Sequence, residues 1–136
     1  MVLVGGGHAN VQVLRFLAEN LTSLVVRPSD RTEGETGDET TRTGVSLTLI
    51  SGEEKASYSG MLPGALAGLY TPSLLQIDLP SLCEWCGAKF VCEWAESIDR
   101  QSRHVLTSSG SRIPFDLLAL DVGSISSVRP LIITFF

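Results

Sequence analysis

A short apolar run that ends in three consecutive glycines constrains the fold of this chain more than any other feature. Residues 1–4 are apolar and Gly5, Gly6 and Gly7 follow directly, which predicts a buried strand stopped by a tight turn. From residue 8 to about residue 21, apolar side chains recur at three- and four-residue spacing, which predicts a helix with one apolar face. Residues 45–50 predict a second strand. Strand, turn, helix and strand in this order predict an α/β fold with a parallel sheet.

The glycine turn has the residue order that dinucleotide binding requires in Rossmann-type folds. Gly5 permits the tight turn, and Gly7 lets the backbone approach a diphosphate closely. The backbone N–H groups at the start of the helix would point at the phosphates, where the helix dipole also favours negative charge. We therefore predict that a dinucleotide diphosphate is bound by Gly5, Gly6, Gly7, His8 and Ala9. A tight turn without a ligand, with His8 packed locally, is the alternative.

Two positions depart from the usual dinucleotide-binding pattern. The third fingerprint position, normally Gly or Ala, is Asn10, and we expect it to loosen the packing of helix on strand. The second strand usually ends near an acid that binds the adenosine ribose. Here it ends at Ser51, with Glu53 and Glu54 just beyond. Ser51 and Glu53 are therefore the candidates for the ribose, and these residues leave FAD and NAD both open.

The rest of the chain alternates helical and strand signals. Residues 27–44, rich in Thr, Gly and acids, predict a mobile insertion without core residues. A short helix is predicted within residues 58–70, and another begins at Pro80 and is capped by Gly87. A small antiparallel meander is predicted from strands at residues 89–94, 97–99, 103–107 and 113–121. We expect the last strand, at residues 115–120, to be buried on both faces. The whole predicts a three-layer α/β domain with a mainly parallel sheet, helices and a β-meander.

Five short motifs follow one another along the chain. They lie at residues 4–8, 47–51, 58–64, 77–79 and 121–124. In this order they resemble the FAD-dependent pyridine nucleotide-disulfide oxidoreductase superfamily. The nearest resemblance is to its type II NADH dehydrogenase-like group, which includes the flavoprotein module fused to selenide water dikinase. The resemblance implies a Rossmann-like FAD-binding domain at residues 1–124 and an atypical apolar tail at residues 125–136.

The resemblance also implies further cofactor-binding residues. Pro63, in the motif at residues 58–64, would lie beside the isoalloxazine ring of FAD. Ala95 and the two residues before it would offer backbone groups to the adenine. Gly123 and Ser124 match the segment at which a strand returns the chain to the cofactor. No catalytic residue is assigned by the resemblance.

The function implied for a full-length relative is hydride transfer from NAD(P)H to FAD, with electrons passed on to an acceptor such as a quinone. Such a relative has a second Rossmann domain for NAD(P)H, whereas this chain ends at Phe136 before a second glycine fingerprint. We therefore expect the chain alone to be incomplete and inactive. The alternatives are a non-catalytic dinucleotide-binding module and, less well supported, a plain NAD-binding dehydrogenase fragment.

Composition excludes several other classes of function. The net charge is −5 and the ten Lys and Arg residues form no basic cluster, which argues against nucleic acid as a partner. No apolar run reaches the ~20 residues that a membrane-spanning helix needs, although peripheral contact with a membrane is compatible with the sequence. No leader precedes the first strand, so we expect a cytoplasmic protein. The oligomeric state is left open.

The three cysteines invite a redox or metal interpretation. Cys83 and Cys86 form a C-x-x-C pair, with Cys92 nearby, but a structural zinc site needs four ligands. The pair falls late in a predicted helix, away from the N-terminal end that lowers a thiol pKa. We therefore predict buried or incidental thiols and no metal.

Overall fold

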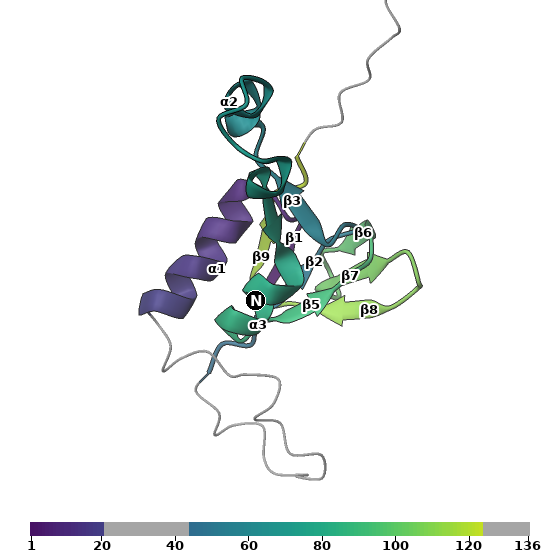
Figure 1. The fold of residues 1–136 in the computed structure, drawn as a ribbon. Coiled ribbons are helices and arrows are strands. Elements are labelled where there is room, and N and C mark those ends of the chain that lie inside the picture. Colours follow the sequence, from purple (N-terminus) through teal and green to yellow (C-terminus); the bar gives the residue numbers. More distant parts are fainter. Residues whose placement is uncertain (21–43, 124–136) are drawn as a thin grey trace, which may run out of the picture.

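A four-stranded parallel sheet forms the centre of the fold in the computed structural model, which describes residues 1–20 and 44–123 (Figure 1). Its strands stand in the order β5-β2-β1-β9, and each neighbouring pair is parallel. They are β1 (Val2–Val4), β2 (Thr48–Ile50), β5 (Lys89–Val91) and β9 (Leu118–Leu120). β2 and β9 lie on opposite sides of β1, so the strand order switches direction there. In open α/β sheets, ligands bind outside the carboxyl ends of the strands at such a point.

Two helices cover one face of this sheet. They are α1 (His8–Asn20) and α3 (Leu79–Cys86), and both were predicted. The Asp78 carboxylate caps α3 by accepting a hydrogen bond of 2.8 Å from the N–H of Ser81. Gly87 ends the helix in the left-handed conformation at φ 68°, which glycine adopts without strain. The predicted cap at Gly87 is therefore confirmed.

A small antiparallel sheet covers the opposite face. It consists of β6 (Ala95–Asp99), β7 (His104–Thr107) and β8 (Arg112–Pro114). Successive side chains of a strand point to opposite faces, so β1 contributes to two cores. Leu3 packs with α1 and α3, whereas Val2 and Val4 pack with Val105 of the meander. Helices, parallel sheet and meander make three layers, which confirms the predicted Rossmann-like α/β class.

The predicted first strand of the meander is wrong, because residues 89–91 form β5 and pair parallel with β2 in the central sheet. The predicted last strand is wrong in two respects. Residues 113–121 form two separate strands, β8 in the meander and β9 in the parallel sheet. β9 is also not buried on both faces, because Leu118 and Ala119 are only partly buried and Leu120 is 58% exposed. An apolar run shows that a strand contacts a core, but it does not show whether other elements cover both of its faces.

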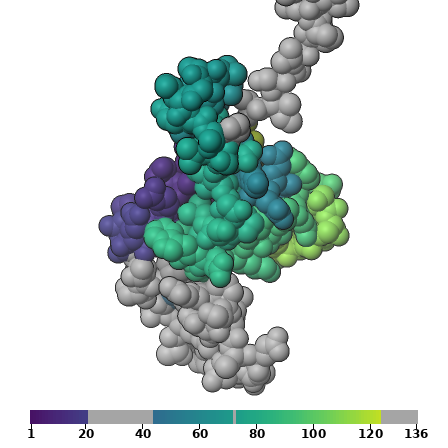
Figure 2. Space-filling model, in the orientation of Figure 1, coloured from purple at the N-terminus to yellow at the C-terminus, as the bar shows by residue number. Residues whose placement is uncertain are grey.

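A hairpin arm between β2 and α3 was not predicted as such. Its strands β3 (Lys55–Ser57) and β4 (Gln76–Asp78) pair antiparallel. Between them lie η3 (Ser59–Met61), α2 (Leu62–Leu66) and η4 (Pro72–Leu75), so the short helix expected within residues 58–70 is confirmed. The arm projects from the body of the molecule, as the teal lobe of Figure 2 shows. It rises from the end of the sheet at which α1 begins (Figure 1).

Some predictions lie outside the described residues. They concern the insertion at residues 27–44, of which only Gly44 is described, Ser124, and the tail at residues 125–136. Within residues 1–20 and 44–123, no helix is both long enough and apolar enough to cross a bilayer.

Candidate functional site

The glycine turn lies where the carboxyl ends of β1, β2 and β9 meet. Gly5 donates a hydrogen bond of 2.8 Å from its N–H to the carbonyl of Ile50 at the end of β2. Its φ of 92° requires glycine. A Cβ at this position would overlap the carbonyl oxygen of Asp121 and lie 2.9 Å from the Cα of Val122. Gly5 is therefore required both for the turn and for the close approach of β1 to the chain that follows β9.

Asn10 fastens helix α1 to the end of β1. Its side chain is only 2% exposed, and its amide nitrogen donates to the carbonyls of Val4, at 3.0 Å, and Gly5, at 2.9 Å. The expectation that Asn10 loosens this packing is wrong. The amide replaces the close contact of a small residue with two hydrogen bonds to the carbonyls at the end of β1.

Asp121 is the site residue whose role sequence reasoning missed. Its carboxylate Oδ2 accepts hydrogen bonds from the backbone N–H of Ala9, at 2.8 Å, and of Asn10, at 3.3 Å. Its own N–H donates to the carbonyl of Val4 at 2.9 Å. A Cβ added at Gly7 would overlap this carboxylate. The available signal was an acid directly after an apolar strand, two residues before a glycine.

Three further N–H groups of the turn are free to bind an anion. The backbone N–H groups of Gly6, Gly7 and His8 have no hydrogen-bond partner in the described part of the chain. They adjoin the positive end of the α1 dipole, which attracts negative charge. Gly6 also lies close to the end of β2, because a Cβ there would be 3.3 Å from the Ser51 hydroxyl. The predicted Gly5, Gly6, Gly7, His8, Ala9 and Ser51 are thus brought together.

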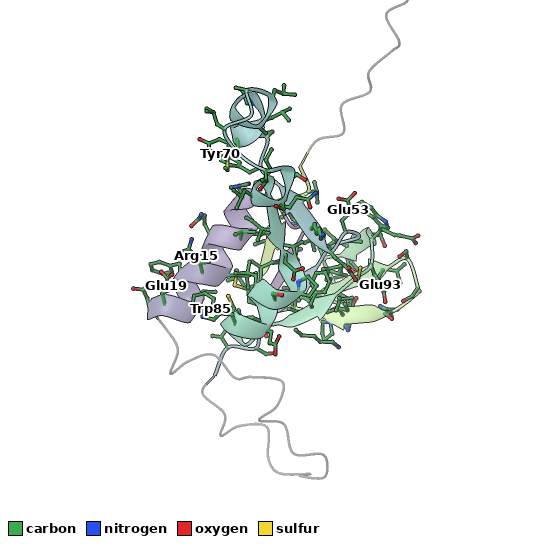
Figure 3. All side chains as sticks on the ribbon, viewed as in Figure 1. Arg15, Glu19, Glu53, Tyr70, Trp85 and Glu93 are labelled. Carbon is green, nitrogen blue, oxygen red and sulfur yellow. The ribbon has the colours of Figure 1, made fainter. Side chains whose placement is uncertain are left out.

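The two candidates for a ribose contact, Ser51 and Glu53, differ in whether their side chains already hydrogen-bond within the protein. The Ser51 hydroxyl donates to the carbonyl of Glu53 at 2.9 Å and accepts from the N–H of Glu53 at 3.3 Å. It therefore stabilises its own loop. The side chain of Glu53 is exposed and stands near the carboxyl end of β2 (Figure 3). Of the two, Glu53 has the carboxylate that can accept hydrogen bonds from ribose hydroxyls.

Ala95 opens β6 beside the loop that follows β2. The indole of Trp94 covers Gly52, where a Cβ would overlap the ring. The Trp94 N–H donates to the Ser108 hydroxyl at 3.3 Å, and its carbonyl accepts from the Ser108 N–H at 2.8 Å. Ala95 itself pairs with Thr107 of β7. The structure thus brings this segment next to the Ser51–Glu53 loop, but Trp94 uses its backbone groups within the protein.

The arm and the glycine turn meet through two rings. The ring centroids of His8 and Tyr58 are 4.3 Å apart, with the planes tilted by 37°. The imidazole of His8 therefore packs on the residue that directly precedes η3 in the arm, and its predicted contact with a phosphate stays a prediction. Pro63 lies in α2 of the arm and is exposed. Its segment contacts the turn through Tyr58.

Gly123 has the properties of a backbone position that another molecule can approach. Its φ is 68°, and no atom of the described chain lies within 4 Å of the place where a Cβ would stand. It follows Asp121 directly after β9, at the same edge of the sheet as the glycine turn. Its predicted partner Ser124 lies outside the described residues.

The cysteines are structural where they are buried. Cys83 is 1% exposed and Cys86 is 4% exposed, both within the core between α1 and α3. Burial raises the pKa of Cys83 to about 12 and also raises the pKa of Cys86. These two thiols are buried as predicted, whereas Cys92 is exposed. Among the described residues, no three His, Cys, Asp or Glu side chains are grouped as metal ligands would be.

Comparison with solved structures shows the same fold in several reductases. The sulfide:quinone oxidoreductase of Aquifex aeolicus matches 90% of this chain with a TM-score of 0.64 and 24% identity. A putidaredoxin reductase, in its covalent complex with putidaredoxin, matches 95% with a TM-score of 0.67 and 20% identity. The ferredoxin reductase of Rhodopseudomonas palustris matches 90% with a TM-score of 0.61 and 23% identity.

These likenesses concern the fold. The chain spans about a quarter of the length of these proteins: 24%, 27% and 26% respectively. No protein-family model and no curated protein sequence matches the chain.

Proposed function

We propose that this chain is the FAD-binding part of a flavoprotein NAD(P)H oxidoreductase. Bound FAD would supply the redox chemistry, accepting hydride from NAD(P)H and passing electrons to an acceptor such as a quinone. The chain's own residues would bind the cofactor and hold it in place.

The observation that carries this proposal is the glycine turn. Gly6, Gly7 and His8 present free N–H groups at the start of a 13-residue helix, at the carboxyl end of a parallel sheet. This donor set suits a diphosphate, which needs several hydrogen-bond donors and a positive potential. The fold shared with three reductases supports the choice of a flavoprotein over other dinucleotide-binding proteins.

The remaining cofactor contacts are assigned by position. Glu53, at the end of β2, would accept hydrogen bonds from the adenosine ribose, with Ser51 holding its loop. The segment ending at Ala95 would adjoin the adenine, because Trp94 packs on that same loop. Pro63 on the arm would adjoin the flavin ring, and Gly123 and Ser124 would approach the cofactor after β9.

A cofactor titration with a matched pair of variants tests the proposal. FAD and NAD⁺ are titrated against the chain, with flavin fluorescence and the visible spectrum as readouts for FAD. Gly7→Ala should weaken FAD binding by about tenfold or more, because its methyl group would stand where the diphosphate must approach. Gly110→Ala is the control for a Gly→Ala change away from the glycine turn, since no atom of the described chain lies within 4 Å of the place where its Cβ would stand. Equal FAD affinity in the parent and Gly7→Ala would contradict the proposal.

A non-catalytic dinucleotide-binding module is the second candidate. The described residues contain one strand–glycine–helix turn of this kind, and hydride transfer needs the nicotinamide held about 3–3.5 Å from its acceptor. Steady-state oxidation of NADH and NADPH, with FAD and a soluble quinone added, separates the two candidates. Rates above those of free FAD, lost in Gly7→Ala, would identify an enzyme. Rates equal to free FAD, with flavin bound, would identify a binding module.

A further inference from the structure

We infer that Asp121 is an internal competitor of the ligand diphosphate and sets how tightly the glycine turn binds a dinucleotide. The inference rests on the proposed function, since it concerns the same turn. It adds a residue that controls affinity and that discriminates between ligands with and without phosphates.

The carboxylate of Asp121 occupies two N–H groups that adjoin the three free donors of the turn. Its Oδ2 accepts from the N–H groups of Ala9 and Asn10, at 2.8 and 3.3 Å, in the first turn of α1. Asp121 is 112 residues from Ala9 in the chain, so the contact depends on the fold. An anion at this position is stabilised by the same dipole and N–H groups that attract a phosphate.

The Asp121 carboxylate also covers Gly7, whose backbone the diphosphate would approach closely. A Cβ at Gly7 would overlap the carboxylate, at 2.2 and 2.4 Å from its two oxygens and 2.3 Å from its carbon. The space above Gly7 is therefore filled by the Asp121 side chain. A diphosphate can approach the Gly7 backbone only after this side chain turns away.

Charge acts in the same direction as shape. A dinucleotide diphosphate carries negative charge, and a carboxylate of like sign close to it raises the free energy of the bound state. Asp121 can move, because its hydrogen bond from Ala9 lies at an exposed position. Binding therefore replaces the Asp121 carboxylate at the start of α1 with the ligand diphosphate. The free energy of binding is the gain from the diphosphate contacts minus the loss of the contacts that Asp121 makes. Ligands without phosphates do not compete with Asp121.

Asp121→Asn is the decisive variant. It removes the charge but keeps a side-chain oxygen that can accept from Ala9, so the start of α1 keeps a cap. We expect FAD, ADP and inorganic pyrophosphate to bind about five- to twentyfold more tightly to the variant than to the parent chain. Adenosine, which has no phosphate, should bind equally to both. Glu84→Gln, which removes one exposed negative charge from α3, is the control and should change no affinity.

Calorimetry with pyrophosphate, ADP and adenosine, and flavin fluorescence with FAD, give distinct outcomes. Tighter binding of the three phosphate-bearing ligands alone supports the competition. Unchanged or weaker ADP and FAD binding in Asp121→Asn, with a parent chain that binds both, overturns the competition and leaves the proposed function intact. A parent chain and variant that bind none of the three phosphate-bearing ligands overturn both.

A measurement on the parent chain removes the dependence on any variant. Saturating pyrophosphate should shift the amide resonances of Ala9 and Asn10 and the side-chain carboxyl resonance of Asp121, because the carboxylate leaves those N–H groups. Pyrophosphate that binds without shifting the Asp121 carboxyl resonance would also overturn the inference.

Discussion

Gly5→Ala isolates the energetic cost of bringing β1 against the chain that follows β9. The new methyl group would force a left-handed backbone at φ 92° on an L-residue and would overlap the carbonyl of Asp121. The backbone strain alone costs about 1–2 kcal/mol. Moving Asp121 away also breaks the hydrogen bond from its N–H to Val4, which is 2.9 Å long. That bond adds about 0.5–1.5 kcal/mol.

The net loss of unfolding free energy should be about 0.5–3 kcal/mol, after subtracting the stabilising effect of about 0.4–1 kcal/mol that Gly→Ala has through the unfolded chain. A loss of this size should lower the midpoint of thermal unfolding by about 2–12 °C in a domain of this length. Gly110→Ala is the matched control, because Gly110 has a similar φ of 83° and open space around it. It should lose about 1 kcal/mol or less.

Urea unfolding followed by the fluorescence of Trp85 and Trp94 measures both variants. A loss in Gly5→Ala within about 0.5 kcal/mol of that in Gly110→Ala would refute the reasoning. It would mean that the methyl group at position 5 meets no steric resistance from Asp121. The stability loss in Gly5→Ala would then come only from the backbone conformation.

Three further predictions follow from the described contacts. Asn10→Ala should lower the unfolding free energy by about 1–2 kcal/mol, because the Gly5 carbonyl loses its donor while the Val4 carbonyl keeps the N–H of Asp121. Asn20→Ala, at an exposed site on the same helix, should change it by less than about 0.5 kcal/mol, and equal losses would contradict this. Iodoacetamide at mildly alkaline pH should modify Cys92 well before Cys83, whose burial raises its pKa to about 12, and peptide mass spectrometry would show the opposite order if the interpretation is wrong. The hydrogen bonds from Ser81 lower the pKa of Asp78, so its stabilising effect is complete above the ordinary value of 3.8 and is lost as the pH falls through the lowered value. Asp78→Asn should therefore show a weaker loss of stability in acid, as urea midpoints over that range would show.

Local patterns predicted the elements whose form is determined locally. The strand before Gly5, the helix after Gly7 and the helix capped by Gly87 all followed from apolar spacing and from conformations that glycine favours. Their bounds agree with the structure to within a few residues. Cys83 and Cys86 lie in the core between α1 and α3, although the prediction of buried or incidental thiols rested on the lack of a fourth metal ligand and on their place late in the helix.

Pairing between strands could not be read from the same patterns. β3 and β4 are three residues each and are separated by the whole of the arm, so neither carries a recognisable alternation. The run at residues 113–121 appeared to be one strand because Pro114 and Asp116 are the only breaks in it. The fold divides it between two sheets, and only the contacts of Leu118 and Ala119 with β1 reveal that division.

The site shows why a glycine pattern is better evidence for close approach than for the identity of what approaches. At Gly5 the approaching group is the backbone of Asp121, and at Gly7 it is the carboxylate of the same residue. At Gly6 it is the side chain of Leu79. Of the four glycines predicted to bind the cofactor, Gly5, Gly6, Gly7 and Gly123, only Gly123 has open space among the described residues where its Cβ would stand. The glycines therefore predicted correctly where the backbone is approached closely, but at three of the four positions the protein itself fills the space. A ligand diphosphate shares this position with Asp121, so the affinity of the turn depends on a residue that the fingerprint does not contain.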